Sequence, residues 1–163
     1  MDDRTLAQER ALGFTPALEP IFPGLDLARD LVLERGSGGR DLKLVRGVDA
    51  LAQDLSIAFT TALGVDVFDT NLGFDGLNAL VEATPSVLTR ERIRVAVIKL
   101  LQREPRVRRI LDVKLDDGRL TATGADTPEA AELRAGRKLE VQVQIETIAD
   151  DRLDVRIGEV PNV

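Results

Sequence analysis

The sequence predicts an α+β fold in which amphipathic helices pack on one face of an antiparallel sheet built from C-terminal hairpins. Two patterns support this fold class. Between residues 47 and 103, apolar residues recur with the 3.6-residue period of helices, whereas beyond residue 107 they alternate with polar residues, as in half-buried strands. The chain has 163 residues, the length of one domain, and such a domain buries roughly 70% of its unfolded surface.

Residues 1–29 are predicted to form an N-terminal arm, and residues 30–163 a single domain. In the arm, a short polar segment that can be helical precedes Pro16, Pro20 and Pro23. These prolines preclude a helix there, because proline lacks an amide hydrogen and clashes with the preceding turn. The apolar side chains of this irregular run either pack across the same domain or order on a neighbouring protein, and both alternatives stay open.

The domain begins with a predicted hairpin over residues 30–46. Two leucines on each strand are expected to face each other across a glycine-rich turn. These leucines are Leu31, Leu33, Leu42 and Leu44. The glycine run also suggests a phosphate-binding loop, but no Gly-Lys-Ser/Thr ending follows and no helix opens directly behind it, so the turn interpretation is favoured.

A helical part is predicted over residues 47–106. Its first helix is expected to begin near Gly47 and to close at Gly64, since glycine commonly follows a helix end. The apolar positions of this central core helix are Val48, Leu51, Ala52, Leu55, Phe59, Ala62 and Leu63. A short helix is expected from about Phe74 to Glu82, before a proline breaks it.

A second long helix is predicted from Thr89 to Arg103, with one apolar stripe on its surface. The residues of this stripe are Ile93, Ala96, Val97, Leu100 and Leu101. Pro105 ends the helix, because its ring removes a backbone hydrogen bond and pushes Glu104 toward an extended conformation. Glu104 and Arg106 flank the proline and are expected to project to the same side of a sharp corner.

Residues 107–163 are predicted to form antiparallel strands. In the first strand, Leu111, Val113 and Leu115 are expected to share the buried face, because they alternate with polar residues. The dipeptide that follows, Asp117–Gly118, is typical of a tight hairpin turn.

A returning strand is therefore expected at Arg119–Thr123, followed by a polar connection at residues 124–137. Alternating apolar and polar residues then predict two more strands, at 139–146 and 153–157. A turn at residues 150–152 is expected to join them.

Charge separates the second long helix and the corner from the rest of the chain. Residues 89–109 contain eight Lys/Arg and two Asp/Glu, a net charge of +6, within a chain of net charge -6, so the remainder carries -12. Such a distribution can steer and orient a protein partner. We therefore interpret this region, including Arg108 and Arg109, as a docking face. In the alternative interpretation its arginines complement the negative end of the helix dipole and stay solvated.

The composition excludes several classes of site. The chain contains neither cysteine nor histidine, which excludes disulfides, Ser-His-Asp and Cys-His catalysis, and imidazole metal ligands. We expect no metal and no cofactor. An acidic chain without Tyr or Trp argues against a nucleic-acid partner. No segment approaches the ~20 apolar residues that cross a bilayer, so we expect no membrane partner and a cytoplasmic protein.

The order of these pieces resembles the baseplate-wedge family of contractile tails, which includes the gene-twenty-five wedge protein of T-even phages and its type VI secretion counterpart. The resemblance covers about Asp41 to Leu115. The motifs that carry it are, in order, Thr61-Ala62-Leu63-Gly64, Leu72-Gly73 and, at the helix-to-strand corner, Glu104-Pro105-Arg106. The chain departs from the family pattern at Val65, where glutamate is frequent, and at Leu72, where an aromatic residue is frequent.

A further motif and the long N-terminal lead are more similar to the version found in extracellular contractile injection particles. That motif is Asn71-Leu72-Gly73-Phe74-Asp75-Gly76-Leu77. The resemblance therefore implies a structural baseplate subunit, present in multiple copies around the tube, that assembles in the cytoplasm into a contractile particle released from the cell.

In this role, the corner formed by Glu104, Pro105 and Arg106 would dock on the helical core bundle of other wedge proteins. A sheet edge would link the baseplate to the first sheath ring and nucleate the sheath, since an uncovered edge can accept a partner strand. The candidate edges are Arg119–Thr123 and Leu153–Ile157, the latter with Leu153, Val155 and Ile157 as binding residues.

The competing hypothesis is a peptidoglycan-cleaving glycosidase, because wedge proteins of this family have been named lysozyme-like and two carboxylates suffice for glycoside hydrolysis. The adjacent acids Asp116–Asp117 and Asp150–Asp151 lie in predicted turns, where aspartate is favoured for its geometry alone. A catalytic acid needs an apolar pocket to raise its pKa, and the sequence places neither pair in one. We therefore favour a protein without enzymatic activity.

Overall fold

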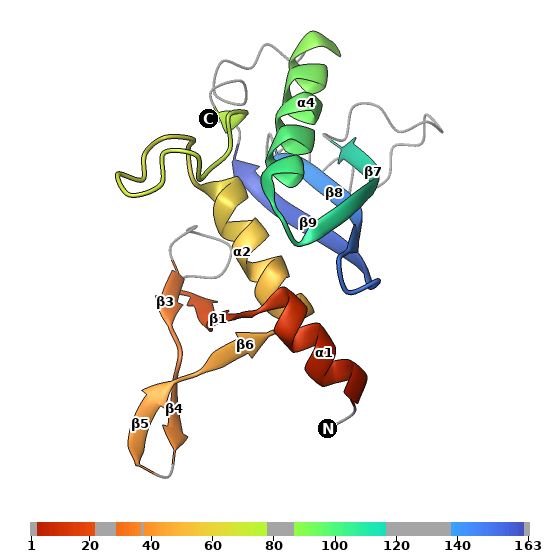
Figure 1. Ribbon diagram of the computed structural model, residues 1–163. Coiled ribbons are helices and arrows are strands. Elements are labelled where there is room, and N and C mark those ends of the chain that lie inside the picture. Colours follow the sequence, from red (N-terminus) through yellow and green to blue (C-terminus); the bar gives the residue numbers. More distant parts are fainter. Residues whose placement is uncertain (1–2, 22–28, 37, 78–86, 117–137, 162–163) are drawn as a thin grey trace, which may run out of the picture. The chain divides into compact units, whose positions relative to one another are not determined.

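The computed structural model describes residues 3–21, 29–36, 38–77, 87–116 and 138–161 (Figure 1). Its helices and antiparallel strands confirm the α+β fold class. Contacts divide the chain into two compact units, Met1–Ile57 and Ala58–Val163. The predicted boundary between residues 29 and 30 stays a prediction, because contacts do not show which parts fold independently.

The first unit contains three short antiparallel ladders, in which β1 pairs with β6, β2 with β3, and β4 with β5. A helix precedes them in the chain, and another begins directly after the last strand. The elements are α1 (Asp3–Leu12), β1 (Phe14–Pro16), β2 (Leu18–Pro20), β3 (Arg29–Leu31), β4 (Leu33–Gly36), β5 (Gly39–Leu42), β6 (Leu44–Arg46) and α2 (Val48–Thr60), whose last three residues belong to the second unit.

The three ladders meet at a closed cycle of backbone hydrogen bonds, which we call the strand junction. The N–H of Ala17 donates to the carbonyl of Lys43 at 2.7 Å, that of Lys43 to Val32 at 2.9 Å, and that of Val32 to Ala17 at 3.0 Å. Each residue therefore satisfies its backbone groups without extending any ladder. The Ala17 side chain is buried.

A glutamine of α2 holds the chain on both sides of Ala17. The Gln53 side chain accepts a hydrogen bond from the Leu18 N–H at 2.9 Å and donates one to the Pro16 carbonyl at 2.8 Å. The Leu18 N–H and the Pro16 carbonyl have no partner in the ladders, so these two hydrogen bonds satisfy them and attach the junction to the helix.

The predicted hairpin is confirmed only for its inner part. Leu33 faces Leu42, as expected, but Leu31 pairs with Leu18, and Leu44 pairs with Pro16. The reason is that the N-terminal run, expected to be irregular, forms β1 and β2 and takes the outer ends of both hairpin strands as partners. Pro16 and Pro20 each end a strand rather than lying in a helix, and a missing donor is tolerated there.

Helix α2 confirms the predicted central helix but ends at Thr60, earlier than expected. Its buried residues are Ala50, Leu51, Leu55, Ala58 and Phe59. The chain leaves the helix because Ala62 forms a parallel bridge with Phe74, and the Leu63 N–H donates to the Phe74 carbonyl at 3.3 Å. Phe74 was expected to begin a short helix, but it forms this bridge instead, and the rest of the predicted helix from residue 78 to Glu82 lies outside the described residues.

The second unit contains a three-stranded antiparallel sheet in the order β7-β8-β9. Helix α4 runs through the corner directly into β7 (Figure 1). The elements are α4 (Val87–Arg103), β7 (Val107–Asp116), β8 (Lys138–Thr147) and β9 (Arg152–Pro161). These bounds confirm the second long helix and the last two strands, whereas the hairpin predicted at residues 117–123 and the connection at 124–137 lie outside the described residues.

The core of this unit combines the predicted apolar stripe of α4 with one face of β8. The buried residues of the two elements are Ile93, Ala96, Val97, Leu100, Leu101, Val141, Val143, Ile145 and Thr147. Phe59 and Phe74 are also buried in this unit, and their rings meet with centroids 5.5 Å apart and a tilted geometry, an arrangement favoured by the charge distribution of aromatic rings.

Strand β7 contains two irregularities that the two-residue period did not predict. Val107 faces Thr147, Ile110 faces Ile145 and Val113 faces Val143 across β8, so nine residues of β7 up to Leu115 oppose seven of β8. The extra residues are Arg108 and Leu111, and each shifts the register as a β-bulge.

The bulges correct one expectation for the buried face. Leu111 was predicted to point inward, but its side chain is 40% exposed, while Ile110 takes the position opposite buried Ile145. Each bulge adds one residue to β7 and none to β8. The inward positions of β7 are therefore Val107, Ile110, Val113 and Leu115, rather than every second residue.

Gly73, the glycine of the Leu72-Gly73 motif at the end of the loop that follows α2, is required by space as well as by backbone angle. Its φ is +113°, and a Cβ atom here would lie 2.7 Å from the Ala62 carbonyl oxygen. Gly64 at the other end of the same loop has a φ of +82°, but a Cβ atom there would meet nothing closer than 3.9 Å. A side chain at position 73 would therefore meet both backbone strain and a steric clash, whereas a side chain at position 64 would meet only backbone strain.

These two glycines give a matched pair of substitutions. Gly73→Ala should lower the free energy of unfolding by about 1 to 3 kcal/mol or more, because it adds a clash to the strain of a positive φ. Gly64→Ala should cost less, since only the backbone strain applies. Urea unfolding of both variants measures the difference, and equal losses would contradict the role of close packing at Gly73.

Candidate functional site

The corner between α4 and β7 is a tight turn held by its own backbone. The Glu104 N–H donates to the Leu101 carbonyl at 3.3 Å, which closes the helix, and the Val107 N–H donates to the Glu104 carbonyl at 3.0 Å, which closes the turn. Pro105 is exposed at the tip. Its fixed φ suits a central turn position, where no amide hydrogen is needed.

Glu104 and Arg106 lie together, as their flanking positions predicted, and they bind each other. The Arg106 Nε donates to Glu104 Oε1 at 2.6 Å, and its Nη2 donates to Oε2 at 2.9 Å. The Arg106 N–H also donates to Oε1 at 3.1 Å. The side chains are only 17% (Glu104) and 22% (Arg106) exposed, so this is a bidentate, half-buried pair.

The carboxylate of Glu104 is held in its charged form. Burial by itself raises the pKa of Glu104, but the hydrogen bonds from the Arg106 side chain and backbone, with the charge of the guanidinium, outweigh it. The pKa of Glu104 therefore lies below its ordinary value of 4.5. A carboxylate that accepts several hydrogen bonds resists protonation for this reason.

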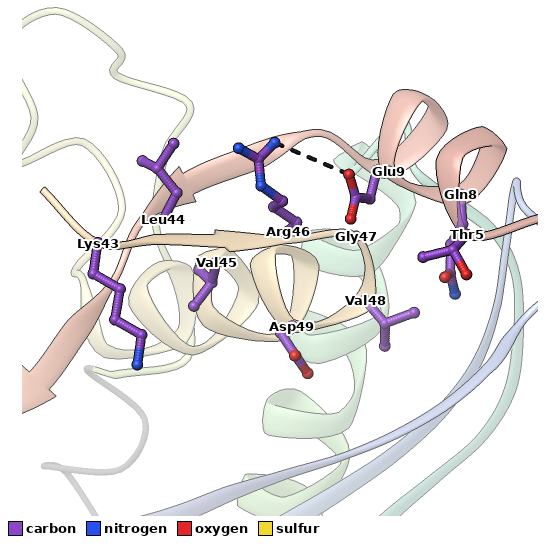
Figure 2. A pocket seen from close by; sticks show the side chains of 10 residues that line it. All are labelled: Thr5, Gln8, Glu9, Lys43, Leu44, Val45, Arg46, Gly47, Val48 and Asp49. Carbon is purple, nitrogen blue, oxygen red and sulfur yellow. Dashed lines mark ion pairs between the residues drawn. The ribbon is translucent and has the colours of Figure 1, made fainter. Parts of the chain in front are cut away.

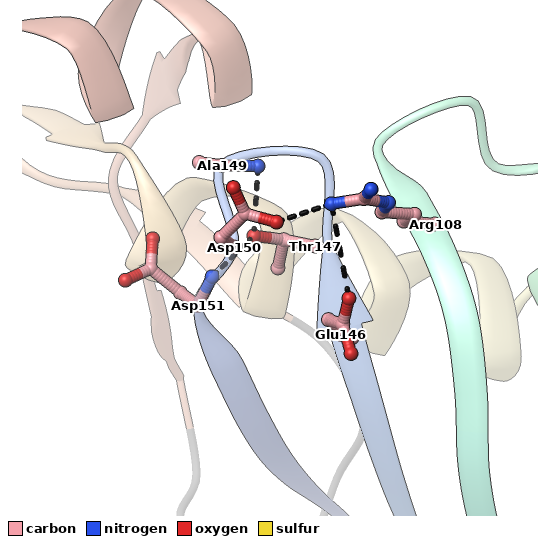
Figure 3. A network of polar contacts seen from close by, with 6 residues as sticks. All are labelled: Arg108, Glu146, Thr147, Ala149, Asp150 and Asp151. Atoms are coloured by element: carbon pink, nitrogen blue, oxygen red, sulfur yellow. Dashed lines mark hydrogen bonds and ion pairs between the residues drawn. The ribbon is translucent and has the colours of Figure 1, made fainter.

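The corner is also tied to the turn between β8 and β9. The Ile148 N–H donates to the Arg106 carbonyl at 3.0 Å. In that turn, buried Thr147 accepts hydrogen bonds at Oγ1 from the Ala149 and Asp151 N–H groups, at 3.2 and 3.3 Å (Figure 3). A buried hydroxyl thus organises the turn to which the corner is fixed.

Arg108 clamps the same turn from β7. Figure 3 shows its guanidinium between Glu146 and Asp150, with Nη1 bonded to Asp150 Oδ1 and 3.9 Å from Glu146 Oε1. Asp150 has a φ of +59°, a conformation that aspartate tolerates better than most residues. Arg108 reaches the turn from a bulge position, so the sequence period of β7 did not reveal this contact.

Several cationic side chains of the region whose sequence is rich in Lys and Arg are exposed. The exposed cationic residues of α4 and of the start of β7 are Arg92, Arg94, Lys99, Arg103, Arg108 and Arg109. Arg109 faces Glu146 across the ladder. The structure therefore places Arg108 and Arg109 beside the corner, with Arg108 engaged in the turn network.

Strand β9 occupies one end of the sheet order, and its geometry shows which backbone groups face outward. The Thr147 N–H donates to the Asp151 carbonyl at 2.9 Å, which makes these two residues a hydrogen-bonded pair at the end of the ladder. Such pairs recur at every second residue and fall at Leu153, Val155 and Ile157 on β9.

The predicted edge residues thus turn their N–H groups toward β8. The Val155 side chain is also buried. The N–H groups of Asp154 and Arg156 point to the outer side, so these residues would offer donors to a partner strand. The sequence did not identify these donors, because the alternation of side chains does not reveal which amides are already paired.

A pocket of about 510 Å³ lies in the first unit, between α1 and the connection from β6 to α2 (Figure 2). Glu9 faces Arg46 across it at 4.0 Å, and the Arg46 guanidinium lies 5.5 Å from the centroid of the Phe14 ring. These contacts hold the helix against β6. Glu9 and Arg46, which line the pocket, thus bind each other and have a role in the fold.

The acidic pairs of the competing hypothesis are placed in part. Asp150 and Asp151 lie in the β8–β9 turn, and the Asp150 side chain is 73% exposed and paired with Arg108. Asp117 lies outside the described residues. Among the residues that the structure describes, no group of three or more acidic side chains is arranged to hold a metal ion, and no helix is long and apolar enough to span a membrane.

Comparison with known proteins bears on the fold of this chain. No family model and no curated protein matches the sequence. A crystal structure from Geobacter sulfurreducens, provisionally named a tail lysozyme, is similar with a TM-score of 0.51 and 20% sequence identity, over 68% of this chain and 86% of that chain. At this identity the likeness shows a shared fold.

The Glu104–Arg106 pair makes a prediction about stability. Arg106→Ala should lower the free energy of unfolding by about 1 to 3 kcal/mol, because it leaves a half-buried carboxylate without its main partner. Exposed Arg109→Ala should change it by no more than about 0.5 kcal/mol. Chemical denaturation compares the two, and similar losses would show that the pair is not a fold element.

The pH dependence follows from the sign of the shift. Because the pKa of Glu104 is lower in the folded state, its contribution is complete above the ordinary value of 4.5 and is lost as pH falls through the folded-state pKa. The stability difference between the wild type and Glu104→Gln should therefore shrink as pH falls from 6 to 3. A difference independent of pH over that range would contradict the assignment.

Proposed function

We propose that this protein is a structural baseplate subunit of a contractile tail or injection particle. It links the baseplate core to the first sheath ring and nucleates sheath assembly. Two independent findings support the proposal: the sequence motifs that resemble the baseplate-wedge family, and a fold shared with a protein provisionally named a tail lysozyme. The observation that carries it is the corner, where the Glu-Pro-Arg motif of the resemblance forms a half-buried, ion-paired turn with exposed cations on the elements that flank it.

In this proposal the corner docks on the helical core bundle of other wedge proteins. Pro105 is exposed at the tip, and the cations beside it give a positive surface that orients an acidic partner. Because the Glu104–Arg106 pair and the Ile148 contact already fix the backbone, little conformational entropy is lost on docking. The subunit would occur in several copies around the tube, in a particle assembled in the cytoplasm and released from the cell.

The sheath is proposed to add a strand to the outer side of β9. Main-chain pairing supplies attraction regardless of side chain, while alternating side chains set the register. The outward N–H groups of Asp154 and Arg156 are the donors for this pairing. The Arg156 side chain is exposed, so a substitution there removes no buried contact.

Proline substitutions separate the two sides of β9. Arg156→Pro removes an outward donor, so the isolated protein should keep its melting temperature within a few degrees, whereas baseplates that contain it should carry few or no sheaths. Val155→Pro is the matched control: it removes a donor to β8 and a buried side chain, and it should unfold the unit. Sheaths are counted by electron microscopy on otherwise complete baseplates.

Normal sheath length on baseplates that contain folded Arg156→Pro would reject this edge as the acceptor. Absence of the wild-type protein from purified particles would reject the structural role as a whole. The two parts of the proposal can therefore fail separately.

The alternative is a peptidoglycan-cleaving glycosidase, which the name of the similar crystal structure favours. In this chain, Asp150 acts in a turn and an ion pair rather than in an apolar pocket. We therefore expect purified protein to release no soluble sugar from peptidoglycan above a heat-denatured control. Steady cleavage that is abolished by Asp150→Asn or by Asp151→Asn, with the fold intact, would replace the structural proposal by the enzymatic one.

A further inference from the structure

The hairpin β4–β5 places like charges directly opposite each other twice. In its register, Leu33 faces Leu42, Glu34 faces Asp41, and Arg35 faces Arg40. Residues directly opposite share a face of the ladder, and successive residues alternate between faces. One face therefore carries two leucines and two arginines, and the other carries the two acids. We call the first the arginine face; its residues are Leu33, Arg35, Arg40 and Leu42.

This arrangement is unfavourable in the isolated hairpin. Like charges directly opposite destabilise a ladder, and a two-stranded ladder is marginal by itself. All residues of both strands are exposed, with the side chains of Leu33 and Leu42 at 56% and 39% of their full exposure. Among the residues that the structure describes, neither Arg35 nor Arg40 forms an ion pair.

A hairpin built for stability alone would pair opposite charges, and exchanging Arg40 with Asp41 in sequence would achieve that. Departures of this kind from local consistency are concentrated at functional sites. The strand junction explains how the hairpin tolerates the cost, since Val32 and Lys43 are fixed by the cycle of hydrogen bonds at its base.

We propose that the arginine face is a docking site for an acidic segment of a partner protein. Two guanidinium groups side by side match carboxylates, which they bind in bidentate geometry, and the leucine pair offers an apolar contact of the kind found at interface centres. The partner therefore carries Asp or Glu residues beside apolar ones.

The charges of the hairpin favour a protein over a nucleic acid. Glu34 and Asp41 lie on the opposite face of the same two-stranded ladder, and the chain has a net charge of -6. A nucleic-acid backbone that extended beyond the arginine face would therefore be repelled by these negative charges. The arginine face contains no aromatic side chain on which bases could stack. This docking site is separate in sequence from the corner and from β9.

The first test concerns the isolated protein and does not depend on its function. Arg40→Glu places opposite charges across the ladder, so the melting temperature should rise at low salt, and the gain should disappear in 1 M NaCl as the charges are screened. Arg109→Glu, a charge reversal of the same size on an exposed strand position outside the hairpin, is the control and should give no such gain. A fall in melting temperature for Arg40→Glu, or a gain that persists in high salt, would overturn the inference.

The second test rests on the proposed function and uses assembled particles. A photo-crosslinking amino acid is placed at Leu33, on the arginine face, or at Glu34, on the opposite face, and crosslinked residues in purified particles are mapped by mass spectrometry. The Leu33 probe should crosslink to a protein segment rich in Asp and Glu, and the Glu34 probe should not. Adding Arg35→Glu and Arg40→Glu should remove the crosslink, and reversing the mapped acids to Lys should restore it.

The outcomes separate the two proposals. If the wild-type protein is absent from particles, the proposed function fails, while the inference still stands or falls by the melting experiment. If both probe variants are incorporated but Leu33 gives no crosslink, or one to a basic segment or to nucleic acid, the docking inference is wrong. A crosslink to a second copy of this chain would likewise replace the acidic partner by self-association.

Discussion

The half-buried pair of Glu104 and Arg106 is the constraint on which the second unit depends. Pro105 forces the chain out of α4, but a proline by itself does not set the direction in which the strand departs. Both oxygens of Glu104 bind Arg106, and the Arg106 carbonyl accepts the Ile148 N–H. The pair thus fixes both the exit from the helix and the attachment of β7 to the β8–β9 turn.

This constraint also changes how the Glu-Pro-Arg motif is understood. The motif could have offered two separated charges to a partner, but the structure uses them first to shape the turn. In the docking role proposed above, a partner would meet the exposed proline and the cations beside it, including Arg109, on a backbone held by these hydrogen bonds. Its part in the fold is compatible with the proposed docking, because a segment that is already ordered loses little conformational entropy on binding.

The strand junction plays a comparable part in the first unit. Ala17, Val32 and Lys43 satisfy one another's backbone groups in a cycle, which allows three two-stranded ladders to meet without forming one continuous sheet. The junction leaves the β4–β5 hairpin exposed on both faces. Its repeated like-charge pairs can persist because its base is held by these hydrogen bonds rather than by cross-strand side chains.

The sequence by itself determined the elements whose causes are local. The 3.6-residue period gave α2 and α4, Pro105 gave the corner, and alternation gave β8 and β9, because each depends on neighbours a few residues away. Only the tertiary structure decided the rest: the bulges at Arg108 and Leu111, the partners of Leu31 and Leu44, and the outward amides of β9. These features depend on which distant strand lies opposite and in what register. The alternation within one strand does not identify its partner strand.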